Sequence, residues 1–132
     1  MKKLLPALLL VAFAAPTSAS QMLTRCDTDR NTSVAYLRCL DKQIQTLNRD
    51  IALWGNNMVF ALEEISQKTG RSDALRLFKK SQKTFTKYVE QNCRWQFLVL
   101  LPDRTSSAIK YKACVIQMSE ARVIELKRVS GK

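Results

Sequence analysis

The stretch of sequence that decides the fold is "SQKTFTKYVEQNC", residues 81–93. Gln82, Phe85 and Val89 recur in it at the three- and four-residue steps of one helix face, and Cys93 ends it. Two interpretations are open: a core helix whose far end is fixed by a disulfide, or a lysine-rich helical surface that binds a partner.

The same spacing extends in both directions from this stretch. It predicts a helix with one inward seam, made of Leu75, Phe78, Gln82, Phe85, Val89 and Asn92. Ser72 or Asp73 can cap its start. The helix runs on into the apolar "WQFLVLL" and must stop by Pro102, because proline cannot continue a helix.

A longer helix is predicted before it and a third one after it. The first has a seam of Leu37, Leu40, Ile44, Leu47, Ile51, Trp54, Met58, Ala61 and Ile65, with Asn31, Thr32 or Ser33 as its cap and Thr69-Gly70 at its end. Gly55 is its weak point, but the seam keeps phase there, which favours one continuous helix. Ser106-Ser107 can open the third helix, with a seam of Tyr111, Val115, Met118, Arg122, Leu126 and Val129. The sequence therefore predicts an all-α fold, a long antiparallel helical hairpin with a third packed helix.

Residues 1–19 have the plan of a secretory signal peptide: two lysines, a short apolar run and small residues before a cleavage point after Ala19. Residues 20–132 then form a single domain, periplasmic or secreted, with no membrane span in its mature form. Without Lys2 and Lys3 the formal charge falls from +11 to about +9. That excess lies mainly after residue 70, so one half of the domain is neutral and the other basic.

The four cysteines predict two disulfides. Cys26, Cys39, Cys93 and Cys114 all lie in the exported part, where an even number of cysteines indicates disulfide bonds. We expect no metal and no cofactor, since the chain has no histidine and no CxxC spacing. Three connectivities are possible; we favour Cys39 with Cys114 and Cys26 with Cys93, although the sequence alone does not select one.

A row of basic residues follows the second helix on the side opposite its seam. The row consists of Arg76, Lys80, Lys83, Lys87 and Arg94. A solvated helix face explains it most simply. The alternative is an electrostatic contact with an anionic partner such as lipopolysaccharide, a wall polymer or an acidic protein patch. Nucleic acid is disfavoured, because the aromatic residues lie on the seam and do not alternate with the lysines.

Three further features bear on function. Trp95 and Phe97 cap the core or, if exposed, anchor a partner. Gln82 and Arg122 are polar members of apolar seams, so we expect them to bond to each other and to Asn48 or Asp41 in a network that fixes the register of the helices. The absence of histidine excludes the usual nucleophile–imidazole arrangements, and we do not expect an enzyme.

With these pieces assembled, the chain resembles the LprI-like lysozyme-inhibitor family of small exported helical domains. The resemblance rests on "CDTDRNTSVAYLRC", Leu47-Asn48, the run Gln82, Phe85, Tyr88 and Cys93, and "CVIQMSEAR". The chain departs from the family pattern at Phe85, at Val89 and in the loop "WQFLVLLPDRTSS". The resemblance implies a binding protein that inhibits a lysozyme or other peptidoglycan hydrolase by steric occlusion. The alternative is a structural envelope module that binds anionic polymer through its basic helix face.

Overall fold

The computed structural model describes residues 20–131. Its elements are α1 (Gln21–Thr24), the 3-10 turn η1 (Asp27–Asp29), α2 (Ser33–Thr69), α3 (Asp73–Val99) and α4 (Arg104–Val129). Over these residues there is no strand, and the predicted all-α fold with two disulfides is confirmed. Among the helices of this part, none is long and apolar enough to cross a membrane. The predicted signal peptide, residues 1–19, lies outside the described residues.

Two of the long helices begin at a residue that the sequence predicted as their cap, α2 at Thr32 and α3 at Ser72, although the Ser72 side chain makes no capping hydrogen bond. Thr32 caps α2, its hydroxyl accepting from the amide of Ala35 at 3.1 Å, and Gly70 ends α2 with a left-handed φ of 71°. The exception is α4, for which Ser106-Ser107 was the expected start. Asp103 caps it instead, because its carboxylate accepts from the amide of Ser106 at 3.0 Å and from the hydroxyl at 2.6 Å.

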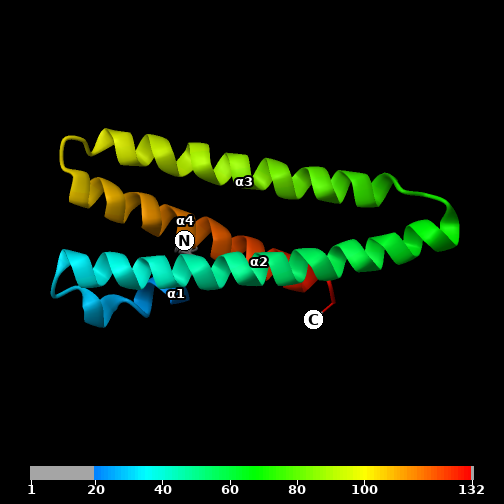
Figure 1. The fold of residues 1–132 in the computed structure, drawn as a ribbon, viewed down its shortest axis with the longest axis horizontal. Coiled ribbons are helices and arrows are strands. Elements are labelled where there is room, and N and C mark those ends of the chain that lie inside the picture. Colours follow the sequence, from blue (N-terminus) through cyan, green and yellow to red (C-terminus); the bar gives the residue numbers. More distant parts are fainter. Residues whose placement is uncertain (1–19, 132) are drawn as a thin grey trace, which may run out of the picture.

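The third helix lies between the two arms of the hairpin. Figure 1 shows α2 and α3 antiparallel, joined at one end by the turn at Gly70, with α4 entering between them from the other end and passing behind α2. Ile116, Val123 and Leu126 of α4 are buried, the first two in the cluster that α2 and the amino-terminal turns form. Tyr111, Val115 and Met118 pack with α3 instead. Because α4 packs against both α2 and α3, its core residues lie on two faces of the helix. The seam predicted from the sequence follows mainly the face towards α3.

The predicted seams of α2 and α3 differ in how much of their length is buried. All six seam residues of α3 are buried or half-buried. Leu40 and Leu47 of α2 are buried as well, but Ala61 and Ile65, near its end, are exposed. A strict three–four alternation repeats every 3.5 residues, whereas a straight helix has 3.6 residues per turn, so the stripe drifts away from its partner. Val129 of α4 is also exposed, at the last residue of its helix.

The favoured disulfide connectivity was wrong. The bonds are Cys26–Cys39 and Cys93–Cys114, with sequence separations of 13 and 21 residues. The η1 turn reverses the chain and brings Cys26 back to α2, while the hairpin of α3 and α4 sets Cys93 opposite Cys114. Each disulfide therefore joins neighbouring segments, and neither crosses the bundle.

Candidate partner-binding surface

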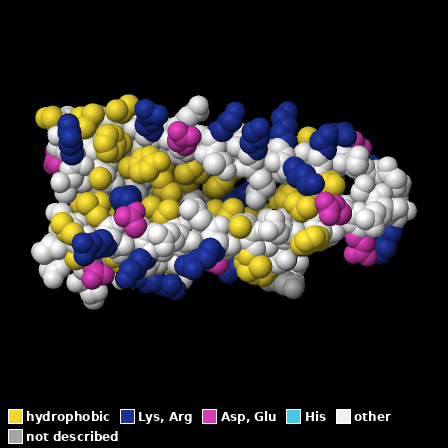
Figure 2. Space-filling view, viewed as in Figure 1, with side chains coloured by type: hydrophobic (Ala, Val, Ile, Leu, Met, Phe, Trp, Pro, Cys, Tyr) yellow, Lys and Arg dark blue, Asp and Glu magenta, His cyan; other side chains and the backbone are white. Residues whose placement is uncertain are grey.

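The outward face of α3 carries the basic row that the sequence singled out, which we name the basic ridge: Arg76, Lys80, Lys83, Lys87 and Arg94. All five side chains are exposed, and Lys and Arg follow one another along the α3 edge in Figure 2. Arg76 pairs with Asp73 at 2.6 Å. Within residues 20–131 no ion pair holds the other four, so their charges face solvent without a counter-ion.

Where the basic ridge ends, at the turn from α3 to α4, the surface becomes apolar. We name this turn surface the apolar tip: Trp95, Leu98, Val99, Leu100 and Leu101. Trp95 is 56% exposed and Val99 70%. Hydrophobic side chains gather at this end of the face in Figure 2. A run of large apolar side chains in water is the usual sign of an interaction site. Phe97, in contrast, is half-buried and is in neither of the two core clusters.

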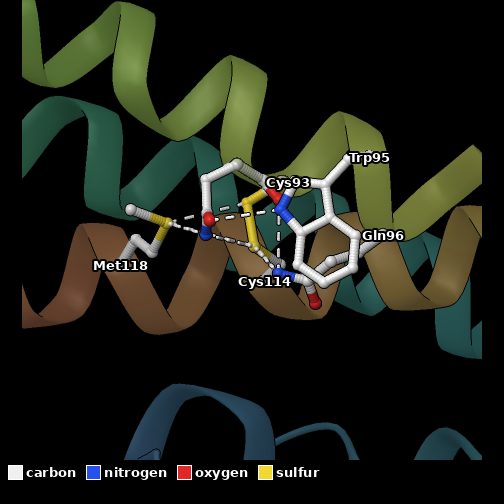
Figure 3. Close-up of a disulfide and its surroundings, with 6 residues drawn as sticks. Cys93, Trp95, Gln96, Cys114 and Met118 are labelled. Atoms are coloured by element: carbon white, nitrogen blue, oxygen red, sulfur yellow. Dashed lines mark hydrogen bonds between the residues drawn. A yellow bond between two sulfur atoms is a disulfide. The ribbon is translucent and has the colours of Figure 1, made fainter.

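The base of the apolar tip is built around the Cys93–Cys114 disulfide. In Figure 3, Trp95 and Gln96 lie on one side of this disulfide and Met118 on the other. The Trp95 indole donates to Oδ1 of Asn92 at 3.3 Å, while Nε2 of Gln96 lies 3.3 Å from the Cys114 sulfur. The first contact orients the indole ring, and the second joins Gln96 to the disulfide.

Further along α3, a polar crossing joins the three long helices. Arg122 of α4 donates from Nε to Oε1 of Gln82 at 3.1 Å, and its guanidinium carbon lies 5.3 Å from the centroid of the Phe85 ring. Its Nη1 bonds to Glu125 at 2.6 Å. The amide of Gln82 packs directly against Gly55 of α2: a Cβ there would lie 2.8 Å from Nε2 of Gln82. A glycine in the middle of α2 is thus what lets α3 bring this amide between the helices.

Part of the expected network is absent from this crossing. Asn48 is exposed and Asp41 pairs with Lys112 of α4, so neither reaches Arg122. Ser81 and Glu125 supply the additional oxygens, both from the surface beside the crossing. The reason for Asp41 is its position along the bundle: its partner Lys112 precedes Arg122 by ten residues on α4, roughly 15 Å of helix, and Arg122 extends towards α3.

Comparison with known proteins adds one finding. The family model described as "Lysozyme inhibitor LprI" matches residues 24–126, which span both disulfides, the polar crossing and the apolar tip. This chain belongs to the LprI family. No curated protein and no solved structure matches it.

The LprI-family domain also has an open groove between α2 and α3, with α4 as its floor. The groove has a volume of about 430 Å³ and is lined by Ile44, Ile51, Phe85, Val89 and Val115, among others. The pair of Asp41 and Lys112 lies in it. Figure 2 shows this furrow as a line of hydrophobic side chains along the centre of the face. Within residues 20–131 no cluster of three metal-binding side chains accompanies it.

Two exposed residues of the LprI-family surface were not predicted as binding residues: Tyr88 entered only through the family resemblance, and Leu77 not at all. Leu77 is 64% exposed and Tyr88 is exposed as well. With Trp95 they recur at steps of eleven and seven, which places them on one flank of α3, beside the basic ridge. That spacing is the signal in the sequence for this flank, beside the inward seam that contains Phe85.

Proposed function

We propose that this protein inhibits a lysozyme or another peptidoglycan hydrolase by steric occlusion. The observation that carries the proposal is the match of residues 24–126 to the lysozyme-inhibitor family. The structure supports it with a rigid scaffold and an exposed apolar surface at one end. Binding of this kind needs no catalytic group on the inhibitor, only a surface that blocks access of the polymer.

The apolar tip and the adjoining basic ridge are the surface we propose for the hydrolase. Tryptophan and arginine dominate the energetics of protein interfaces, and Trp95 and Arg94 are neighbours at the tip. Trp95 is already held by Asn92, so little side-chain entropy is lost when a partner covers it. The charge of the ridge suits a hydrolase that presents acidic groups.

This role also requires that the protein share a compartment with its target. We propose that residues 1–19 direct export and that the domain acts in the periplasm or outside the cell. Two disulfides in a domain of this size are in keeping with an oxidising compartment.

Lysis assays test the proposal. The oxidised domain is purified and added in increasing amounts to lysozymes of the chicken, goose and invertebrate types acting on peptidoglycan. We expect a saturable loss of lysis for at least one of them. The control is the same domain after reduction and alkylation, which loses both disulfides. Undiminished lysis by all three enzymes at excess inhibitor would refute the proposal.

A second candidate function has its own observation. Lys80, Lys83 and Lys87 are exposed and make no ion pair within the described chain, so the basic ridge is free to bind an anionic envelope polymer. Binding of this kind weakens steeply with salt. Replacement of the three lysines with glutamine should then reduce binding to lipopolysaccharide. If the variant still binds lipopolysaccharide and salt does not weaken that binding, the basic ridge does not have this function.

A further inference from the structure

The charge of the domain restricts where on a hydrolase it can bind. With a formal charge near +9 after loss of Lys2 and Lys3, it meets electrostatic repulsion at any basic surface within a Debye length of about 8 Å at physiological salt. Close contact is favourable only where the partner presents negative charge. The inhibitor must therefore find an acidic region, even on a hydrolase that is basic elsewhere.

A hydrolase of the lysozyme kind has an acidic place that its chemistry requires. Most glycosidases cleave the glycosidic bond with two carboxyl groups on either side of it, held in the substrate cleft. Ligand clefts are also lined mainly by apolar and aromatic side chains. A concave apolar site with carboxylates at its centre is complementary to a convex apolar surface flanked by cations.

The end of this molecule presents that combination. The α3–α4 turn lies at one end of the elongated bundle in Figure 1. Four consecutive aliphatic residues, Leu98 to Leu101, are exposed on it. Arg94 and Arg104 bracket them and are exposed, with no ion pair in the described part of the chain. The acid in this segment, Asp103, is engaged as the α4 cap, and the Ser106 hydroxyl and amide hold the pKa of its carboxyl below the ordinary value.

We infer that the apolar tip enters the substrate cleft of the hydrolase, where Leu98 and Val99 cover the apolar wall and Arg94 and Arg104 pair with the cleft carboxylates. This inference rests on the proposed function and adds the mode of binding: the inhibitor occupies the cleft in which the hydrolase binds peptidoglycan. The Cys93–Cys114 disulfide joins α3 to α4 at the base of the turn, and the amide of Asp103 donates to the carbonyl of Leu100 at 3.1 Å within it, which reduces the entropy lost on insertion.

Competition with a sugar ligand tests the mode. Binding of the oxidised, full domain to an inhibited lysozyme is measured with and without a chito-oligosaccharide that fills the cleft. We expect the two to exclude each other, so that the apparent Kd rises in proportion to the oligosaccharide concentration. We also expect that amide replacement of the cleft carboxylates weakens binding of the wild-type domain but not of the Arg94→Gln/Arg104→Gln variant.

Variants of the tip provide the second arm. Leu98→Ser/Val99→Ser should weaken inhibition by tenfold or more, about the loss seen when an interface hot spot is removed. The matched control is Phe60→Ser, which changes a 68%-exposed apolar residue on α2, outside the tip. It should inhibit as the wild type does. Circular dichroism of all variants confirms that each is folded.

The outcomes separate this inference from the proposed function. Absence of inhibition by the wild type refutes the function, and the mode with it. Inhibition that persists with the oligosaccharide bound, or that survives loss of the apolar tip, overturns the mode alone. The tip could instead enter a lipid surface. Binding to anionic phosphatidylglycerol vesicles that Leu98→Ser/Val99→Ser abolishes, with inhibition unchanged, would also overturn the mode.

Discussion

Replacement of Gly55 with alanine should destabilise the protein, although the same change stabilises most helices. In a helix interior alanine is favoured over glycine by about 1 kcal/mol. Here the added Cβ would lie 2.8 Å from Nε2 of Gln82, closer than such atoms approach. The amide ends a flexible side chain and can move, and we expect that movement to break one of the hydrogen bonds that its Oε1 accepts from Arg122.

The magnitude follows from what that movement breaks. Gln82 accepts from two nitrogens of Arg122, whose side chain is only 12% exposed. A hydrogen bond to a charged group contributes about 1.5–3 kcal/mol, so loss of one such bond outweighs the helix gain. We expect a net loss of about 1 kcal/mol, which lowers Tm by roughly 4 °C in a domain of this size.

A double-mutant cycle in thermal denaturation, followed by circular dichroism on the oxidised protein, measures this. Gly55→Ala should lower Tm in the wild-type background and raise it in a Gln82→Ala background, where nothing opposes the new methyl group. The sign change is the decisive result. If Gly55→Ala raises Tm in both backgrounds, Gln82 is not constrained by Arg122 and our account of the polar crossing is incorrect.

Three other predictions concern the disulfide, a cap and a buried hydroxyl. Replacement of both Cys93 and Cys114 with serine should lower the free energy of unfolding by about 3 kcal/mol, and loss of the Cys26–Cys39 disulfide should lower it by a similar amount. Only the loss of Cys93–Cys114 should also weaken inhibition of the hydrolase, because this disulfide lies at the base of the apolar tip. The pKa of Asp103 lies below its ordinary 3.8, so its contribution to stability is present above about pH 4 and is lost as the pH falls through the folded pKa. Asp103→Asn, which caps without titrating, should flatten this part of the acid-denaturation profile; an unchanged profile would show that the carboxyl has an ordinary pKa. The Ser107 hydroxyl is buried with no partner in residues 20–131, so Ser107→Ala should raise stability by up to about 1 kcal/mol in urea titrations, and a loss would mean that a hidden partner exists.

The helices and one contact of the candidate site were predictable because they depend on local rules. Thr32 and Gly70 mark the ends of α2 by capping chemistry, and the six seam residues of α3 follow from helical period alone. The Gln82–Arg122 contact was predictable too, since a polar residue on an apolar seam needs a partner and few were available.

What the sequence did not contain was the order of the helices in space. Cys93 was assigned to Cys26 on the assumption that α3 packs along α2, whereas α4 lies between them and places Cys114 beside it. Asp41 lies at another level of the bundle from Arg122, where it pairs with Lys112, ten residues earlier on α4. The exposure of Trp95 was left open for a related reason: whether a turn is covered depends on which elements end nearby, and that is a property of the assembled bundle.

Both disulfides lie towards the end of the bundle that carries the apolar tip, and the opposite end is closed only by the turn at Gly70. Amide hydrogens near that turn should therefore exchange fastest among the helices, and local unfolding should begin there and stop at the polar crossing. The protein can loosen at one end while the other keeps its shape. The Gly70 turn is accordingly the position for a tag or a surface attachment that leaves the tip undisturbed.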